Sequence, residues 1–181
     1  MSEHRREELI HSFILTFCKY GLDGTTTKRL AEDAGLSEAG LYVHFKNKED
    51  ILFCCVEEHF DRVSAETRKL VGLYGDRPEQ FISVMFAFVK SMLMENRFIF
   101  QVLSHPQYGG GIKNLRSNLI SGIKLLQPIL GKIGVSQEAG PALLLLFNSA
   151  LNNYILTQDE TGFQMQMEFL LNYIKKEQGY L

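Results

Sequence analysis

The segment Gly24–Asp50 constrains the fold of this 181-residue chain more than any other. Its sequence, GTTTKRLAEDAGLSEAGLYVHFKNKED, predicts two short helices separated by a tight turn. Gly35 lies where the first helix must end, because glycine adopts the left-handed conformation of a helix C-terminus at little cost. Ser37 follows two residues later and is a suitable N-cap for the next helix. The segment therefore predicts a helix-turn-helix.

Apolar side chains fall on one side of each predicted helix. Leu30, Ala31 and Ala34 share one side of the first helix, and Leu41 and Phe45 share one side of the second. Both apolar stripes can meet where the two helices cross. The opposite face of the second helix, which we expect to run from Glu38 to Phe45, then carries Glu38, Ala39, Tyr42 and Val43.

Small residues on this second helix and hydrogen-bond donors at its flank suit a surface that contacts DNA. A glycine inside a helix costs roughly 1 kcal/mol relative to alanine, and close approach to base edges is one reason for Gly40. Tyr42, His44, Lys46 and Lys48 carry donors that can bond phosphates. Similar helix pairs also occur in all-α proteins that never touch nucleic acid, so spacing alone leaves a structural role open.

The same segment resembles the N-terminal DNA-binding domain of the tetracycline-repressor (TetR) family. That family has an aromatic residue and a glycine before a G-T-T turn, then an alanine-rich helix, Ala-Gly, and L-Y-x-H-F-x-x-K. The matching residues here are Phe17, Gly21, Gly24, Thr25, Thr26, Ala31, Ala34, Gly35, Ser37, Leu41, Tyr42, His44, Phe45 and Lys48. The resemblance implies a homodimeric transcriptional regulator, usually a repressor, which a small ligand releases from a palindromic operator in double-stranded DNA.

The resemblance also implies roles for individual residues. The residues expected to hold phosphates are Thr26, Thr27, Lys28, Tyr42, His44 and Lys48. Those expected to face the bases are Glu38, Ala39, Gly40 and Val43, and the predicted DNA-binding surface further includes Ser37 and Lys46. Glu38 departs from the family pattern, in which a basic or amide residue is common. A carboxylate there repels phosphate unless it accepts a hydrogen bond from a cytosine amino group.

Composition limits how the chain can bind DNA. Its hydrophobic content of 45% supports a folded core, and its net charge of −2 is not that of a general nucleic-acid binder. Any DNA binding must therefore depend on a local cluster of cations, and we expect Lys28, Arg29, Lys46 and Lys48 to share one face.

Cysteine usage and hydropathy predict a cytoplasmic location. The chain has three cysteines, two of them adjacent at Cys54 and Cys55, which is not a disulfide framework. The charged N-terminus is not a signal segment, and the longest apolar run, Ala142 to Phe147, is too short to span a membrane. We therefore expect no membrane partner.

The remaining chain reads as a series of helices. The predicted elements are a first helix over 4–20, a long fourth helix capped by Asn47 and ending near Pro78, a helix over 79–94 that is apolar nearly all round and is expected to be buried in the middle of a bundle, a short helix over 97–104, a loop over 105–111, an amphipathic helix over 112–133, a helix over 141–156, and a final helix that includes Phe163 to Ile174. The predicted fold is all-α with about nine helices, a helix-turn-helix domain in residues 1–47, and an effector-binding and dimerisation domain in residues 48–181.

Each of the last two predicted helices has apolar residues on more than one face, so packing against a single neighbour leaves some of them uncovered. A monomer would expose this apolar surface, so we expect an isologous homodimer that closes a four-helix bundle. The alternative is that this surface lies inside one bundle. The residues predicted for the dimer interface are Leu144, Phe147, Leu151, Tyr154, Ile155, Met167, Leu170 and Ile174.

Methionine and aromatic residues in the middle of the chain can line a ligand cavity or can simply form the core. The few polar side chains among them favour a small, largely apolar effector. The residues predicted to bind it are His59, Arg62, Met85, Phe86, Val89, Arg97, Phe100, Gln101 and Tyr108.

Other chemistry is weakly represented in the sequence. The chain has no G-x-S-x-G elbow, phosphate loop or dinucleotide fingerprint, so we expect neither an enzyme nor a cofactor. Cys55 and His59 are spaced i, i+4, but two ligands do not make a metal site. The alternative function is a helical protein-interaction or thiol/metal sensor module in which DNA binding is vestigial.

Overall fold

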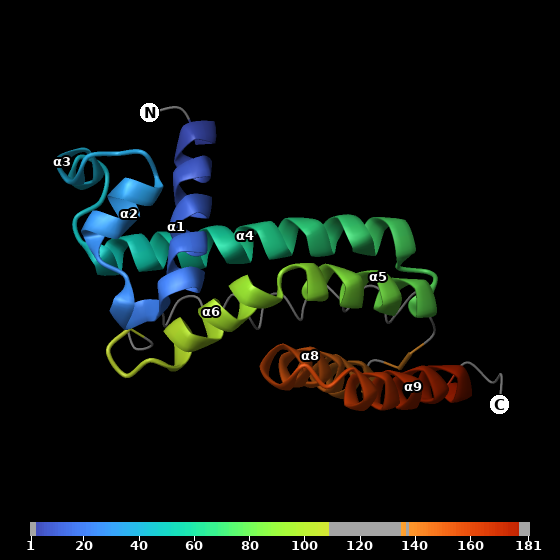
Figure 1. The fold of residues 1–181 in the computed structure, drawn as a ribbon. Coiled ribbons are helices and arrows are strands. Elements are labelled where there is room, and N and C mark those ends of the chain that lie inside the picture. Colours follow the sequence, from blue (N-terminus) through green and yellow to red (C-terminus); the bar gives the residue numbers. More distant parts are fainter. Residues whose placement is uncertain (1–2, 109–134, 137, 178–181) are drawn as a thin grey trace. The chain divides into compact units, whose positions relative to one another are not determined.

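A computed structural model describes residues 3–108, 135–136 and 138–177 of the chain. These residues form eight α-helices and no β-strand, which confirms the all-α class (Figure 1). The helices are α1 (Glu3–Gly24), α2 (Thr27–Asp33), α3 (Glu38–Tyr42), α4 (Lys48–Tyr74), α5 (Pro78–Ser91), α6 (Leu93–Ser104), α8 (Ala139–Thr157) and α9 (Glu160–Glu177). The prediction was about nine helices, and the helix predicted over 112–133 lies outside the described residues.

The chain divides into two compact units. Among the described residues, the first unit contains those up to Arg62 and those from Met94 to Tyr108. The second contains Val63–Leu93 and the residues from Val135 onward. Helix α4 contributes to both units, and the predicted domain boundary after residue 47 lies inside the first.

A single hydrophobic cluster holds the first unit together. It joins buried side chains of α1, α2, α3, α6 and the first half of α4. The ring of Phe13 in α1 meets Phe45 edge-on, with centroids 5.4 Å apart, and Phe17 stacks on Phe98 of α6 at 5.3 Å. The helix-turn-helix is therefore anchored to α1 by aromatic contacts, as the apolar stripe of the first helix predicted.

Helix α1 bends where glycine was expected to end it. Gly21 has φ 73° and ψ 172°, which is not helical, and one further turn reaches Gly24. This conformation suits glycine because side chains with a Cβ rarely adopt positive φ. Beyond it, the Thr25 hydroxyl donates to the Gly21 carbonyl at 2.7 Å and begins the turn into α2.

Helix α5 is less buried than its sequence suggested. Phe81, Met85 and Val89 form one buried stripe, whereas Ile82 and Phe86 are only half-buried. The expectation that this helix is buried in the middle of a bundle therefore holds for one side only, because continuous apolar sequence does not specify which side faces the core. The helix ends at Ser91, and α6 begins at Leu93, earlier than expected.

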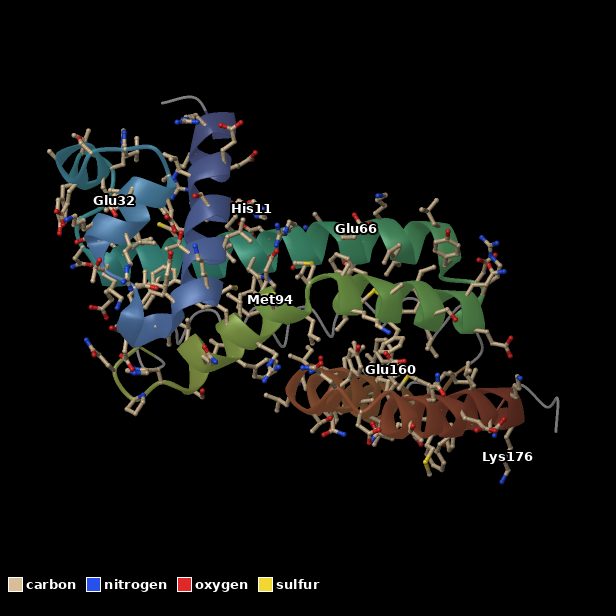
Figure 2. The ribbon with its side chains drawn as sticks, viewed as in Figure 1. His11, Glu32, Glu66, Met94, Glu160 and Lys176 are labelled. Carbon is tan, nitrogen blue, oxygen red and sulfur yellow. The ribbon has the colours of Figure 1, made fainter. Side chains whose placement is uncertain are left out.

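In the second unit, α8 and α9 lie side by side and antiparallel (Figure 1). Only two residues connect them, and the first, Gln158, has a left-handed conformation with φ 60°. Helix α5 contacts both. Its Phe86 ring stacks on Phe163 of α9 with centroids 4.1 Å apart. Glu160, at the start of α9 in Figure 2, pairs with Lys90 of α5.

Within the described parts of the chain, no helix is both long enough and apolar enough to cross a bilayer.

Candidate nucleic-acid interface

Helix α2 and its turn are defined by local hydrogen bonds. Thr26 is the N-cap, and its hydroxyl accepts from the Arg29 backbone N–H at 3.2 Å. Gly35 follows the helix with φ 68°, and the Leu36 N–H then bonds the Ala31 carbonyl at 2.8 Å. The structure confirms the prediction that glycine ends this helix in the left-handed conformation.

Helix α3 is shorter than the sequence predicted. Ser37 caps it as expected, with its hydroxyl accepting from the Gly40 N–H at 3.0 Å. The helix ends at Tyr42 rather than Phe45, and residues 43 and 44 form a turn. A Cβ on Gly40 would lie 3.1 Å from the Ser37 hydroxyl oxygen, so the cap itself provides a reason for glycine there.

The face of α3 opposite the core is open to solvent. Leu41 and Phe45 are buried in the first-unit cluster. By contrast, Tyr42 is 50% exposed and Val43 is 76% exposed. The other predicted DNA-binding residues are also at the surface: Thr26, Lys28, Ser37, Glu38, Ala39, His44 and Lys46 are exposed, and Thr27, Gly40 and Lys48 are partly exposed. Large apolar and aromatic side chains therefore point outward from a well-anchored helix.

Three of these side chains are bonded to one another. The Thr27 hydroxyl donates to the Glu38 carboxylate oxygen Oε1 at 2.8 Å. The Tyr42 hydroxyl donates to the Thr27 hydroxyl oxygen at 3.3 Å. We call Thr27, Glu38 and Tyr42 the hydroxyl–carboxylate network; it connects the start of α2 to α3 across the exposed face.

Two cations of the predicted positive patch, Lys48 and Arg29, have partners within the chain. The Lys48 ammonium donates to the Leu22 carbonyl, and burial lowers its pKa. Arg29 was predicted only as part of the positive patch. Its guanidinium donates to the Gly24 carbonyl at 2.7 Å and lies 4.6 Å from the centre of the Tyr20 ring. Lys28 is highly exposed and only loosely paired with Glu32, at 3.9 Å.

Two carboxylates of the helix-turn-helix region, Asp33 and Asp50, accept hydrogen bonds from groups of the same chain. Asp33 accepts from the buried Thr16 hydroxyl at 2.9 Å, and Asp50 accepts from the Lys46 backbone N–H at 2.9 Å. Asn47 caps α4 as predicted, since its side-chain oxygen accepts from the Asp50 N–H at 2.8 Å. These acids contribute to the local fold of the helix-turn-helix.

The fold and this exposed face define an all-helical protein with an N-terminal helix-turn-helix of the kind that docks in a DNA groove. Residues 16–54 match the family described as bacterial regulatory proteins, tetR family. The helix-turn-helix segment of the chain is therefore similar to that family.

Two curated proteins share this likeness. The HTH-type transcriptional repressor Rv1474c of Mycobacterium tuberculosis is 29% identical over 82 residues, which are 42% of this chain and 44% of that protein. The chain thus matches less than half the length of this relative. The icaADBC negative transcriptional regulator IcaR of Staphylococcus aureus is 25% identical over 78% of this chain and 79% of its own.

A solved structure extends the likeness in fold to nearly the whole chain. A putative TetR-family transcriptional regulator from Mesorhizobium loti superposes with a TM-score of 0.72 at 17% sequence identity. The match covers 97% of this chain and 98% of that one.

The residues predicted to bind an effector are not gathered in one unit. His59, Arg62, Arg97, Phe100, Gln101 and Tyr108 belong to the first unit, and Met85, Phe86 and Val89 belong to the second. In the first unit, Tyr108 is part of the hydrophobic cluster, whereas Arg97 and Gln101 are exposed. The predicted effector site therefore remains a prediction.

A polar cluster in the first unit includes a residue that the sequence did not single out. Glu95 of α6 pairs with Arg62 of α4, and its Oε2 lies 3.7 Å from Nδ1 of His59. His11 of α1, labelled in Figure 2, lies 3.5 Å from the Arg62 guanidinium through its Nδ1. Glu95 occurs within an apolar stretch, which was the only sequence signal for it.

His59 is 2% exposed, and its Nδ1 has no hydrogen-bond partner. Burial, and then the charge of Arg62, lowers the pKa of His59 to about 4. Glu95 does not reverse this shift, because its carboxylate pairs with Arg62 and lies beyond hydrogen-bond distance of Nδ1. His59 is therefore a neutral imidazole at physiological pH.

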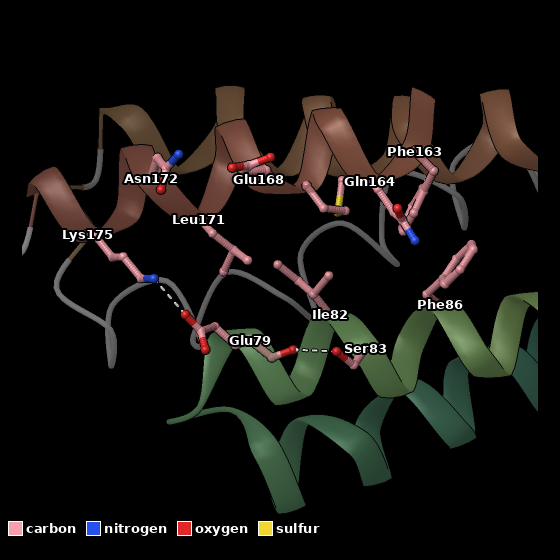
Figure 3. Close-up of a pocket in the computed structure, with 11 residues that line it drawn as sticks. Glu79, Ile82, Ser83, Phe86, Phe163, Gln164, Glu168, Leu171, Asn172 and Lys175 are labelled. Carbon is pink, nitrogen blue, oxygen red and sulfur yellow. Dashed lines mark hydrogen bonds and ion pairs between the residues drawn. The ribbon is translucent and has the colours of Figure 1, made fainter. Parts of the chain in front are cut away.

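An open groove lies between α5 and α9 in the second unit (Figure 3). Its volume is about 460 Å³, and Glu79 and Lys175 form an ion pair of 2.7 Å at one end. Both apolar and polar side chains line it; the lining residues are Glu79, Ile82, Ser83, Phe86, Phe163, Gln164, Met167, Glu168, Leu171, Asn172 and Lys175. Phe86 is the one predicted effector residue among them.

The residues predicted for the dimer interface lie inside the chain instead. All eight are buried in the second unit: Leu144, Phe147, Leu151, Tyr154, Ile155, Met167, Leu170 and Ile174. Because a second copy cannot cover side chains that are already buried, this choice of residues was wrong. Other apolar side chains of the same helices are exposed, namely Leu145, Leu146, Leu156, Met165 and Phe169.

The three thiols do not favour the sensor alternative. Burial raises the pKa of Cys18 to about 11 and also raises the pKa of Cys54 and of Cys55. A protonated thiol is a poor nucleophile and a poor metal ligand. In the part of the chain that the structure describes, no three His, Cys, Asp or Glu side chains cluster as metal ligands.

Proposed function

We propose that the chain is a sequence-specific DNA-binding transcriptional repressor that acts in the cytoplasm as a homodimer on a palindromic operator. The observation that carries the proposal is the exposed face of α3, where Tyr42 and Val43 point to solvent while Leu41 is fully buried. A helix anchored on one side and open on the other can enter a major groove about 12 Å wide. Lys28 and Lys46 are exposed beside this face, where they can contact phosphates.

The homodimer is supported by the apolar surface that the single chain leaves open on α8 and α9. Leu145 and Leu156 are three helical turns apart on α8, and Met165 and Phe169 are one turn apart on α9. Each pair therefore lies along one side of its helix. Two such surfaces can meet across a two-fold axis to form a four-helix bundle, which makes a dimer that matches a palindrome.

We further propose that a small, largely apolar ligand controls release from the operator. The groove between α5 and α9 is a candidate because its volume falls in the range of small-molecule sites and its lining includes the apolar side chains of Ile82, Phe86, Phe163, Met167 and Leu171. To switch the dimer from mostly bound to mostly released, the ligand must favour the released conformation by about 5.5 kcal/mol.

Selection of binding sites from a random double-stranded DNA library tests the DNA-binding function. We expect the wild-type protein to enrich a palindrome whose half-sites are about 10 base pairs apart. The affinity for this palindrome, measured by fluorescence anisotropy, should fall steeply as salt increases.

Two variants separate positioning contacts from base contacts in this experiment. Lys28→Ala should weaken binding to all sequences alike, whereas Val43→Ala should change the preferred bases. If wild-type protein at low salt enriches no sequence, the repressor proposal fails and a protein-interaction module becomes the better reading.

A further inference from the structure

The hydroxyl–carboxylate network has a direction that follows from counting protons. The Thr27 hydroxyl carries one proton, and the Glu38 carboxylate can only accept, so that proton lies in the 2.8 Å bond between them. Thr27 therefore cannot donate to Tyr42, and the 3.3 Å bond between these two hydroxyls uses the proton of Tyr42. The chain of donation runs from Tyr42 through Thr27 to Glu38.

This direction changes the roles expected for Thr27 and Tyr42. The family resemblance implies that both hold phosphates, which requires a hydroxyl proton to donate to a phosphate oxygen. In the structure both hydroxyl protons are used inside the network. Phosphate contacts therefore depend on the exposed cations nearby, such as Lys28 and Lys46.

The network also fixes the carboxylate of Glu38. Its Oε1 is held by Thr27, and its helix is held by the Ser37 cap and by the fully buried Leu41. The other oxygen, Oε2, accepts no hydrogen bond from the residues that the structure describes. Glu38 is exposed on the face of α3 that we propose enters the DNA. If this face of α3 docks in the groove, Oε2 reaches the base edges in an orientation that the bond from Thr27 has already fixed.

We propose that Glu38 determines specificity by accepting a hydrogen bond from the N4 amino group of a cytosine in each half-site, and that Thr27 and Tyr42 position its carboxylate. This inference rests on the proposed DNA-binding function. A carboxylate has no proton for the acceptors of guanine or thymine, and phosphates repel it. In the major groove, glutamate is matched by the amino group of cytosine.

The experiment uses the full-length protein and the palindrome that wild type selects. For each of the four bases at every half-site position, competition anisotropy gives the relative affinity. We expect one position at which cytosine is preferred by about 5- to 150-fold over the other bases. Glu38→Gln should shift the preference at that position toward adenine, because a side-chain amide pairs with adenine.

The positioning role is tested by variants of the two residues that hold the Glu38 carboxylate. Thr27→Val and Tyr42→Phe each remove one hydroxyl and keep the shape of the side chain. Each should reduce the cytosine preference at the same position by about 2- to 10-fold, the effect of one hydrogen bond, and leave other positions unchanged. Lys46→Ala is the matched control and should weaken binding without altering any preference.

The outcomes separate this inference from the proposed function. If wild type selects a palindrome but Thr27→Val and Tyr42→Phe weaken binding to every sequence equally, both residues are phosphate contacts and the inference is wrong. It is also wrong if Glu38→Gln selects the same bases as wild type. If wild type selects no sequence, it is the proposed function that fails. Circular dichroism melting curves check that each variant is folded.

Discussion

At the scale of single residues, the chain keeps several polar groups in environments that alter their chemistry. The His59 imidazole is buried beside the Arg62–Glu95 ion pair, and its pKa is lowered to about 4. The cysteine thiols are shifted in the opposite direction, because burial disfavours their anionic form. In both cases the fold selects the neutral state of the side chain.

The shift at His59 predicts a loss of stability in mild acid. Below pH 6.5 the unfolded chain protonates this histidine, whereas folded His59 stays neutral until about pH 4. The unfolded state then binds more protons, so the free energy of unfolding should decrease as pH falls from 6.5 to 4, by up to about 3 kcal/mol from this residue. Urea denaturation of wild type at pH 7, 6, 5 and 4 measures this decrease.

His59→Leu isolates that contribution, since other groups also titrate in acid. The variant should lose less stability than wild type between pH 7 and pH 4. His44→Gln, at an exposed histidine, is the control and should follow the wild-type pH dependence. Equal pH dependence in wild type and His59→Leu would contradict a neutral buried His59.

At the scale of elements, turns and caps define the helix-turn-helix more sharply than helix propensity does. Helix α3 has only five residues, too few to be stable alone, and depends on its Ser37 cap and on the burial of Leu41. The turn before it depends on Gly35, whose φ is 68°.

Two glycine substitutions should have opposite effects on stability. An added Cβ would meet nothing within 4 Å at either Gly35 or Gly72, so only the backbone conformation differs between them. Gly35→Ala should destabilise the protein by about 1–2 kcal/mol because of its positive φ. Gly72→Ala, inside α4, should stabilise it by about 0.5–1 kcal/mol.

Thermal and urea unfolding of the two variants provide the comparison. If Gly35→Ala were as stable as wild type, the left-handed conformation would not be required for the turn between α2 and α3.

At the scale of the whole molecule, the proposed dimer depends on the apolar surface of α8 and α9. Leu145 is 59% exposed and Phe169 is 61% exposed on a single chain. Burying such side chains stabilises an association by roughly 25 cal/mol per Å² of apolar area removed from water. A charge placed there must lose its hydration in the dimer and should oppose assembly.

Leu145→Lys and Phe169→Glu should each raise the dimer dissociation constant by about tenfold or more, corresponding to at least 1.4 kcal/mol. Analytical ultracentrifugation measures the constant. Leu73→Lys is a matched control, because Leu73 is 53% exposed but lies on α4. If wild type is monomeric at micromolar concentration, or if Leu73→Lys alone disrupts the dimer, the proposed surface is wrong.

Much of the first unit could be predicted from sequence because its signals are local. The glycine at 35, the caps at Ser37 and Asn47, and the apolar spacing of Leu30, Leu41 and Phe45 each act within a few residues. These local rules predicted which side of α3 is buried. They did not predict that α3 ends at Tyr42, since the ends of short helices depend on tertiary contacts.

Contacts between residues far apart in the sequence could be learned only from the tertiary structure. In α8 and α9 several faces are apolar, so the pattern could not tell which face packs against the chain's own core and which stays exposed, and the predicted interface residues turned out to be buried. The pairing of Glu38 with Thr27, and of Glu95 with Arg62, joins residues 11 and 33 positions apart. The sequence by itself determined an all-α chain with a helix-turn-helix, because caps and periodicity are local properties. Tertiary packing determined which polar groups meet and which apolar faces remain open, because those depend on elements that approach only when the chain folds.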